Sequence, residues 1–353
     1  MVSAAKKAET TTSDLFMKAL VYFNPGSKAD CFVATRLRKN IKGSLELADV
    51  VWVESLFALP ELLHLLSPED EAKMHDAKLD GLKVVVSALY TESDPAARYF
   101  QKDPDGFYRL RGKAERLLEG ADLILVPCLG AKDALVQAGI KNPHFAILSA
   151  GVNVARFERG DPVETGVVYR YLRFPEGAKY VFSAGDYEDS EVLAKFDAVA
   201  KACPEVRFFF VGVRRGIAGD VAQKKLNKNA SSNCRYLDLL EDDVFRSAMV
   251  NASVYLSFPS LGSDQILALE AMASKTQIIC FGKPLSRDVI EEKKNAYCYT
   301  SADRVAKAIE SCCAGKLTPT IIEGYRKAKS CSLKKVGQQL KAMYESLLKG
   351  PEE

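Results

Sequence analysis

The feature that most constrains the fold is a strand–loop–helix–strand pattern across residues 252–281. Residues 252–257 and 277–281 are short, apolar, β-rich runs that predict buried strands. Between them, a turn rich in Pro, Ser and Gly leads into a helix in which Ile266 and Leu269 recur at helical spacing. Two strands joined through a helix form the crossover unit of a parallel sheet. The stretch therefore predicts an α/β fold.

The start of that helix is a candidate binding site. Ser263 or Asp264 can cap it, because a short side-chain oxygen accepts a free N–H of the first helical turn. A loop that feeds a helix N-terminus at the carboxyl end of a parallel strand also favours anions. Glu270 lies about two turns into the helix. A carboxylate on an arbitrary helix is most often solvated, but the apolar residues on both sides of Glu270 favour a position facing a polar cleft.

Strand and helix patterns alternate in both halves of the chain, and the 353 residues suit two domains. The predicted division is a disordered tail at 1–16, an N-terminal domain at 17–160, a C-terminal domain at 161–318 and a final helix region at 319–353. The final region is predicted as one helix, at about 319–348, whose apolar seam consists of Leu333, Val336, Leu340, Met343 and Leu347. The seam suits packing against the first domain, a coiled coil or a membrane surface.

Four further segments are predicted from local pattern alone. Residues 55–66 are predicted as an amphipathic helix carrying His64, which is interpreted as structural, and residues 68–80 as a polar surface excursion. The lysine-rich run at 224–228 predicts a solvated loop, and residues 284–292 predict a helix.

The helix predicted at about 29–41 is basic. It carries Arg36, Arg38 and Lys39, with Lys42 just beyond it. These residues indicate either a solvated basic face or a contact with anionic lipid or an anionic acceptor.

Composition narrows the classes of function. A net charge of +3 is close to neutral, which argues against nucleic acid as the main partner. Nine cysteines without a C-x-x-C pair or zinc spacing indicate a reducing compartment and buried thiols, and predict no metal site. No apolar run approaches the roughly 18 residues of a spanning helix and no signal peptide is seen, so the protein is expected to be cytoplasmic, either soluble or peripheral to a membrane.

Motifs of other α/β enzymes are missing. No G-x-G-x-x-G follows a strand, and the sequence has neither a G-x-x-x-x-G-K-[ST] loop nor a G-x-S-x-G elbow. Dehydrogenases, P-loop enzymes and α/β-hydrolases are therefore disfavoured.

Three segments share their patterns with one enzyme family. Segment 258–274, FPSLGSDQILALEAMAS, is similar to a signature in which Pro-Ser, a short loop and Glu lead, after seven residues, to Glu-Ala-Met-Ala. Segment 121–140 is similar to a strand ending at Pro-Ser and a helix ending at Gly-Ile, and segment 147–157 to a domain-junction motif, Asn-Gly-Val-Asp-x-x-x-Phe. In this order, the segments resemble the group 1, family 4-like retaining glycosyltransferases of GT-B fold.

That resemblance implies two Rossmann-like domains, parallel sheets flanked by helices, and a C-terminal helix that crosses back to the N-terminal, acceptor-side domain. It implies a UDP- or GDP-linked nucleotide sugar as substrate, without a further cofactor or metal. Glu270 matches the second Glu of the signature and would bind the ribose, and the Ser263–Ile266 segment would offer backbone amides to the diphosphate or sugar. The predicted donor-binding residues are Glu270, Ser263, Asp264, Gln265, Ile266, Gly185, Arg214 and Arg215. The predicted acceptor-side residues are Gly26, Ser27, Ala88 and Thr91, and no catalytic residue is identified.

The donor site departs from the family pattern. Gly262 stands where the first Glu of the signature is expected, and Ala88 stands where a His is expected. Segment 185–191 is acidic, whereas the family has diphosphate-binding cations in this region. Arg214 and Arg215 are the candidate replacements for those cations.

These departures keep two functions open. The first is an active retaining glycosyltransferase that acts on a lipid, polysaccharide or protein at the cytoplasmic membrane face. The second is a catalytically inactive GT-B-like binding or regulatory subunit beside an active glycosyltransferase. A third interpretation is a generic two-domain α/β protein with an unrelated ligand.

Overall fold

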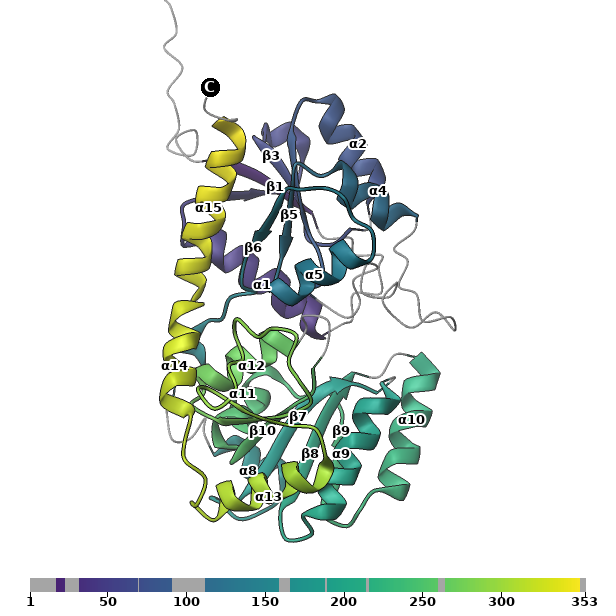
Figure 1. The fold of residues 1–353 in the computed structure, drawn as a ribbon, viewed down its shortest axis with the longest axis vertical. Helices are drawn as coiled ribbons and strands as arrows, with labels where there is room; N and C mark the ends of the chain where they lie inside the picture. Colours follow the sequence, from purple (N-terminus) through teal and green to yellow (C-terminus); the bar gives the residue numbers. More distant parts are fainter. Residues whose placement is uncertain are drawn as a thin grey trace, which may run out of the picture.

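Two α/β domains are stacked along the long axis of the molecule (Figure 1). The computed structural model describes residues 17–22, 32–68, 70–90, 112–158, 166–187, 189–213, 216–259 and 264–349. Among these residues, each domain contains a six-stranded sheet, and all strand pairs in both sheets are parallel. Helices cover the faces of both sheets (Figure 1). The predicted α/β fold with two Rossmann-like domains is confirmed.

The N-terminal sheet has the strand order β2-β1-β3-β4-β5-β6. Its strands are β1 (Lys18–Tyr22), β2 (Val51–Val53), β3 (Leu62–Leu65), β4 (Lys83–Ser87), β5 (Leu123–Val126) and β6 (Phe145–Ile147). The helices of this half are α1 (Phe32–Glu46), α2 (Glu71–Leu79), α4 (Lys113–Gly120), α5 (Leu129–Gln137) and the short α6 (Val154–Phe157), with a 3-10 turn η2 (Leu56–Ala58). The strand order reverses between β1 and β3, so this is the topological switch point of the sheet.

The C-terminal sheet has the strand order β12-β11-β10-β7-β8-β9. Its strands are β7 (Tyr180–Asp186), β8 (Arg207–Val213), β9 (Cys234–Leu237), β10 (Val254–Ser257), β11 (Gln277–Phe281) and β12 (Tyr297–Tyr299). Its helices are α8 (Val167–Leu172), α9 (Ser190–Ala202), α10 (Gly216–Asn229), α11 (Asp242–Asn251), α12 (Asp264–Ala273) and α13 (Ala302–Cys313). Here the strand order reverses between β7 and β10.

Both sheets are buried on both faces, which explains why their strands are continuous apolar runs. Along β8, Phe208 and Phe210 belong to the core cluster on one face. Phe209 and Val211 belong to the cluster on the other face. Successive side chains of a strand point to opposite faces, so a strand covered on both sides needs an apolar residue at every position.

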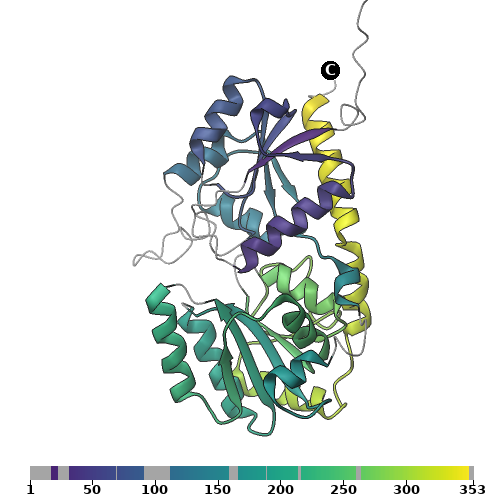
Figure 2. The same cartoon turned by 180° about the vertical axis from the view of Figure 1, so that it is seen from behind.

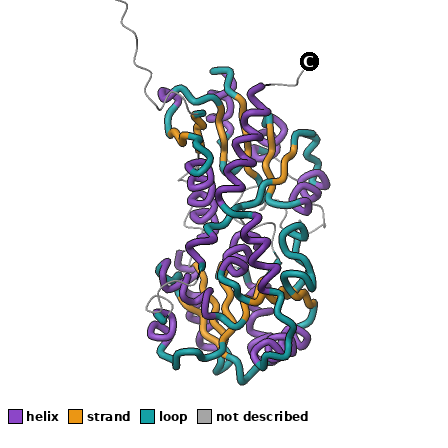
Figure 3. Tube along the Cα trace, turned by 90° about the vertical axis from the view of Figure 1, so that its left-hand side faces the viewer, coloured by secondary structure: helices purple, strands orange, loops and turns teal. Residues whose placement is uncertain are grey.

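The C-terminal segment crosses from the second domain to the first, as predicted. Helix α14 (Ile321–Ser330) packs on α12, and α15 (Leu333–Lys349) packs along α1. Figure 3, viewed from the side of these helices, shows them running from one domain onto the other. Val336, Leu340 and Tyr344 are buried in a core cluster of the N-terminal domain. The apolar seam read from the sequence therefore serves the contact with the first domain.

The predicted single final helix is interrupted between α14 and α15. The backbone N–H of Val152 donates to the carbonyl of Cys331 at 3.0 Å, and the N–H of Leu333 donates to the carbonyl of Val152 at 3.2 Å. This bridge to the interdomain segment uses backbone groups at the break, so one straight helix does not form.

The predicted helix at 55–66 is wrong. Residues 62–65 instead form β3, which lies between β1 and β4 and is buried along its whole length. Pro60 disrupts a helix because it lacks an N–H and clashes with the preceding turn. The apolar run that follows is the signature of a central parallel strand, and His64 lies on it.

Three other local predictions are also wrong. The expected excursion at 68–80 contains α2, whose first turn is capped by the Asp70 side chain. The lysines of 224–228 lie on α10, which the Asn227 amide ties to β9 through the carbonyl of Tyr236 at 2.9 Å. The segment 284–292 has no helix in the described structure, where it consists mainly of turns and bends.

Within the part of the chain that the structure describes, no helix combines the length and the apolar character needed to cross a membrane.

Candidate functional site

The carboxyl ends of the two sheets face the domain junction (Figure 1). Helix α1 follows β1 at the first switch point, and α12 follows β10 at the second. Seen from behind, α1 lies directly above α12 (Figure 2), and the two helices are in contact. Open α/β sheets bind their ligands outside the carboxyl ends of the strands at such a switch point. The junction of α1 and α12 is therefore the candidate site.

Glu270 of α12 lies at this junction and is not solvated, since only 4 % of its surface is exposed. Its Oε1 accepts a hydrogen bond from Nη1 of Arg36, on α1, at 3.0 Å. Burial raises the pKa of Glu270, although the neighbouring Arg36 guanidinium opposes the rise. The sequence predicted that Glu270 faces a polar cleft; in the described structure its carboxylate is buried against a guanidinium of the other domain.

Arg36 joins Glu270 to further charged and aromatic groups. Its Nη2 lies 3.9 Å from Oδ1 of Asp242, on α11, and its guanidinium carbon lies 4.4 Å from the centre of the Phe245 ring. Arg156, on α6, forms an ion pair with the other oxygen of Asp242. We call Arg36, Arg156, Asp242 and Glu270 the junction network. It draws one residue from the N-terminal domain, one from the connecting segment and two from the C-terminal domain.

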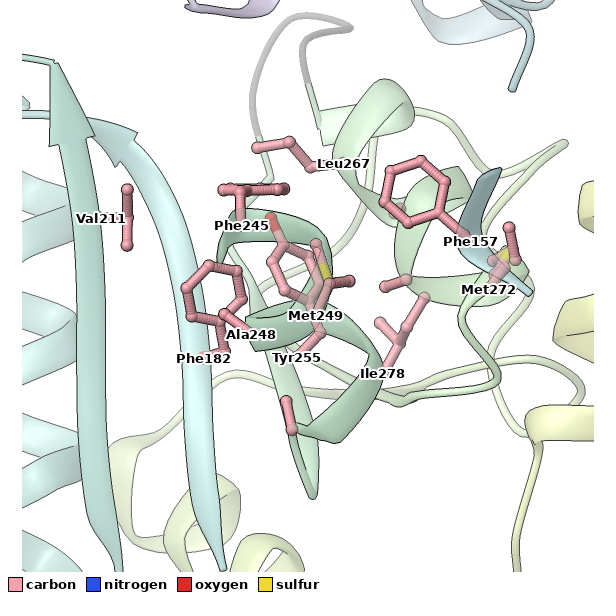
Figure 4. Close-up of a cluster of buried hydrophobic side chains, with 14 of the residues drawn as sticks. Phe157, Phe182, Val211, Phe245, Ala248, Met249, Tyr255, Leu267, Met272 and Ile278 are labelled. Carbon is pink, nitrogen blue, oxygen red and sulfur yellow. The ribbon is translucent and has the colours of Figure 1, made fainter. Parts of the chain in front are cut away.

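Electrostatics within the junction network are balanced. Burial tends to raise the pKa of Asp242, but the hydrogen bond and charge of Arg156, together with Arg36, leave it below its ordinary value. The network also contacts the apolar core. The Arg36 guanidinium lies over Phe245, which packs edge-to-face on Phe182 with ring centroids 5.3 Å apart. Figure 4 shows Phe245 between Phe182 and Leu267 within this cluster. The charges are therefore held on a well-packed support.

Sequence reasoning found only part of this network. Glu270 was identified from its motif, and Arg36 was placed on a basic helix. The solvated alternative is wrong for Arg36, of which 7 % is exposed. Arg156 and Asp242 were missed, and the signals for them are weak: a position inside the 147–157 junction motif, and an acidic residue in the first turn of a helix.

Two other predicted donor-site residues join the domains. The side-chain Oε1 of Gln265 accepts from the N–H of Ala150 at 2.7 Å, and its Nε2 donates to the carbonyl of Pro127 at 2.7 Å. Ile266 is fully buried in a core cluster of the N-terminal domain. Both side chains are thus committed to the interface, while the role of their backbone amides in binding a diphosphate stays a prediction.

Gly185 and Ala88 lie at the carboxyl edges of their sheets. Gly185 is paired with Gly212 of β8, and a Cβ atom on Gly185 would lie 3.1 Å from the Phe210 ring. Ala88 follows β4, donates its N–H to Leu125, and buries its methyl group in an apolar cluster. Their predicted roles toward donor and acceptor stay predictions.

The remaining predicted site residues lie outside the described structure. Asp264 is described only as the first residue of α12. The residues that fall outside are Gly26, Ser27, Thr91, Arg214, Arg215 and Ser263.

Solved structures share this architecture. Sucrose-phosphate synthase from Thermosynechococcus elongatus is 13% identical, with a TM-score of 0.71 over 95% of this chain and 99% of that chain. HepE from Anabaena, solved in complex with UDP and glucose, is 14% identical, with a TM-score of 0.68 over 93% of this chain and 99% of that chain. The chain has the GT-B fold. At these identities the likeness concerns the fold.

A curated relative of this GT-B protein is also known. The processive diacylglycerol alpha-glucosyltransferase of Acholeplasma laidlawii is 24% identical over 230 residues, which are 65% of this chain and 69% of the relative. No family model matches the chain. The resemblance read from the three sequence segments is thus confirmed, since the relative is a glycosyltransferase and the structures are GT-B proteins.

Proposed function

We propose that this GT-B protein is a glycosyltransferase that moves a sugar from a nucleotide sugar to an acceptor hydroxyl. The observation that carries the proposal is the position of Glu270. It stands in the Glu-Ala-Met-Ala motif, on the helix that follows the switch point of the C-terminal sheet, and its carboxylate lies at the domain junction. A carboxylate there can accept hydrogen bonds from ribose hydroxyls, because each hydroxyl is a donor.

The proposed donor is a UDP-sugar, with UDP-glucose as the first to test. HepE, of the same fold, was solved with UDP-glucose. The N-terminus of α12 would offer amides and a positive dipole end to the diphosphate. Such fixed positive groups stabilise the charge that develops on the leaving diphosphate. No further cofactor or metal is proposed, and a GDP-sugar is the second donor to test.

The proposed acceptor is a lipid hydroxyl, and the proposed outcome is retention. The curated relative is named as a diacylglycerol alpha-glucosyltransferase. UDP-glucose carries its sugar in alpha linkage, so an alpha-glucosyl product would retain the configuration. A lipid acceptor would bring this protein to a membrane surface, and we propose the cytoplasmic face.

The test is a transfer assay with the full chain. Purified protein is incubated with UDP-[14C]glucose and phosphatidylcholine vesicles containing diacylglycerol, with GDP-mannose in parallel. The expected result is labelled glycolipid in the organic extract, of alpha configuration by glycosidase digestion. Glu270→Gln keeps the shape of the side chain but removes its charge, so transfer should fall about 10-fold or more. Glu310→Gln, at an exposed position on α13, should leave transfer unchanged.

Two observations favour a second candidate, an inactive binding or regulatory subunit. The Oε1 of Glu270 is already bonded to Arg36, and Gly262 replaces the first Glu of the signature. Such a subunit would bind UDP, measured by calorimetry, without transfer to lipid or hydrolysis of UDP-glucose. That outcome would reject the enzyme in favour of the subunit, whose partner would be an active glycosyltransferase. If the protein neither binds nor turns over any of these nucleotides, both candidates are rejected.

A further inference from the structure

The junction network contains an unsatisfied group. Oε2 of Glu270 has almost no accessible surface and no hydrogen-bond partner among the described residues, whereas Oε1 is bonded to Arg36. A buried polar atom without a partner costs about 1–3 kcal/mol, and more if it is charged. The carboxylate is therefore incompletely paired, and a hydroxyl donor that reached it would complete its hydrogen bonding.

The expected cations for a diphosphate are missing from the C-terminal domain loop after β7. Segment 185–191 contains no Lys or Arg. Its described acidic side chains interact with α9, because Asp189 caps the helix by accepting from Val192 at 3.0 Å and Glu191 pairs with Lys195 at 2.6 Å. A nucleoside diphosphate at this edge would need positive charge from elsewhere.

Arg36 is well placed to supply that charge. It lies on α1, which follows the switch point of the facing sheet, and it already contacts the carboxylate assigned to the ribose. Ribose and diphosphate are adjacent in a nucleotide, so a nucleotide whose ribose reaches Glu270 would bring its diphosphate close to Arg36. A guanidinium also matches the oxygens of a phosphate with two parallel N–H donors, and a diphosphate carries more charge than one carboxylate.

We propose that Arg36 is the nucleotide-positioning residue of the N-terminal domain, which exchanges its bond to Glu270 for the donor diphosphate when a nucleotide binds. In the described structure, Arg36 ties α1 to α12 across the junction. On binding, the ribose hydroxyls take the carboxylate of Glu270 and the diphosphate takes the guanidinium. The inference rests on the proposed function, because it concerns the same nucleotide site. The exchange involves only hydrogen bonds and ion pairs, with no covalent bond broken and no proton transferred.

This exchange is electrostatically reasonable. Removing one partner of a buried ion pair leaves an unpaired charge, which is strongly destabilising. The exchange avoids this state because the ribose and the diphosphate arrive on one molecule. Asp242 keeps its ion pair with Arg156 throughout, so the second half of the junction network can stay in place. Closure of the two domains and nucleotide binding would then be coupled through one side chain.

The experiment compares a nucleotide with its nucleoside. Calorimetric titrations of the full chain with UDP and with uridine separate the contribution of the phosphates, since both ligands carry the base and ribose. We expect Arg36→Ala to weaken UDP binding about 10- to 100-fold, the range for a lost charge-assisted bond, while uridine binding stays equal or tightens. Arg36→Lys keeps the charge without the forked geometry and should fall between Ala and wild type. GDP and guanosine form a second pair.

The matched control is Arg38→Ala. Arg38 is two residues further along the same helix, its side chain is 50% exposed, and its Nη2 lies 3.9 Å from Oε1 of the exposed Glu54. This variant should bind UDP and uridine as the wild type does. Circular dichroism and the fluorescence of Trp52 check that each variant is folded.

The outcomes separate this inference from the proposed function. If wild type binds UDP but Arg36→Ala binds it equally well, Arg36 does not position the nucleotide and the inference alone is rejected. If UDP and uridine weaken by the same factor, Arg36 merely supports Glu270, and the inference is again rejected. If wild type binds neither nucleotide nor nucleoside, the proposed function fails first and the inference falls with it.

Discussion

His64 should make the N-terminal domain sensitive to acid. The ring is fully buried on β3, where Nδ1 lies 2.6 Å from the Tyr344 hydroxyl and Nε2 lies 2.8 Å from Oγ of Ser87. Tyr344 belongs to α15, so the imidazole links the central sheet to the crossing helix. Burial lowers the pKa of His64 from 6.5 to about 3. We propose to remove this titration with His64→Gln, which keeps a polar amide at the position.

The magnitude follows from proton linkage. The unfolded chain binds a proton at His64 below pH 6.5, but the folded chain does so only near pH 3, so acid favours the unfolded state. The contribution of neutral His64 to the free energy of unfolding is complete above pH 6.5. It is lost as the pH falls toward 3, by about 1.4 kcal/mol per pH unit. At pH 5 the loss should amount to about 2 kcal/mol. His64→Gln should not show this loss.

The assay is urea unfolding at pH 7 and pH 5, followed by the fluorescence of the single tryptophan, Trp52, which lies on β2 of this domain. At pH 7 we expect His64→Gln to lower the free energy of unfolding by about 1–2 kcal/mol through poorer hydrogen bonding. At pH 5 the wild type should have lost about 2 kcal/mol of its free energy of unfolding and the variant none, so the variant should be equal to the wild type or more stable. His75→Gln, on the exposed side of α2, is the matched control. An equal pH dependence in wild type and His64→Gln would refute the reasoning.

Three other predictions concern packing, the domain junction and thiol chemistry. Gly337→Ala should lower stability by about 3 kcal/mol in thermal unfolding, because the new Cβ would lie 1.9 Å from the carbonyl oxygen of Ser44 on α1. Gln265→Ala removes three hydrogen bonds between the domains, to Ser149, Ala150 and Pro127, so it should cost about 2 kcal/mol and increase the radius of gyration in X-ray scattering. In the native protein, iodoacetamide should modify Cys298 before Cys203, as read by mass spectrometry. Cys203 is buried with its pKa raised to about 12, whereas a hydrogen bond from a neighbouring thiol lowers the pKa of Cys298.

Each of these predictions has an internal control. Gln338→Ala is an exposed change one residue further along α15 and should not alter the thermal midpoint. Gln137→Ala is an exposed change on α5 and should leave the scattering profile unchanged. In denatured protein, iodoacetamide should modify Cys298 and Cys203 at similar rates. The packing argument is contradicted if Gly337→Ala unfolds at the wild-type temperature. The junction argument is contradicted if Gln265→Ala keeps the wild-type radius of gyration. The thiol argument is contradicted if native Cys298 and Cys203 react at equal rates.

Much of the fold could be predicted from the sequence, because its signals are local. The strands expected at 252–257 and 277–281 are β10 and β11, and the helix expected between them is α12. Chain periodicity carries this information, since a strand buried on both faces must be apolar throughout and a packed helix must repeat its apolar face. The seam at the end of the chain suited a contact with the first domain, a coiled coil or a membrane surface, and the structure shows the first of these. The seam did not predict the break near Ser332, which depends on a bridge to Val152.

The strand β3 shows where local reasoning fails. Pro60 argues against one helix across 55–66, but the apolar run at 62–65 is too short for periodicity to separate a strand from a helix. Its pairing with β1 and β4 decides for the strand. The same holds for His64. Its type suggested a structural role, but its neutral state depends on burial between the sheet and a helix 280 residues away in sequence.

For the candidate site too, one part could be predicted from the sequence and the other depends on the tertiary structure. The sequence by itself determined the α/β class and the two-domain plan and marked Glu270 as a candidate site residue, because a motif and a periodicity are properties of neighbouring residues. Only the tertiary structure decided that the carboxylate of Glu270 is buried against Arg36, from which it is separated by 234 residues. An ion pair between two domains depends on how their sheets are placed. That placement comes from the packing of α1, α12 and α15, and no local pattern encodes it.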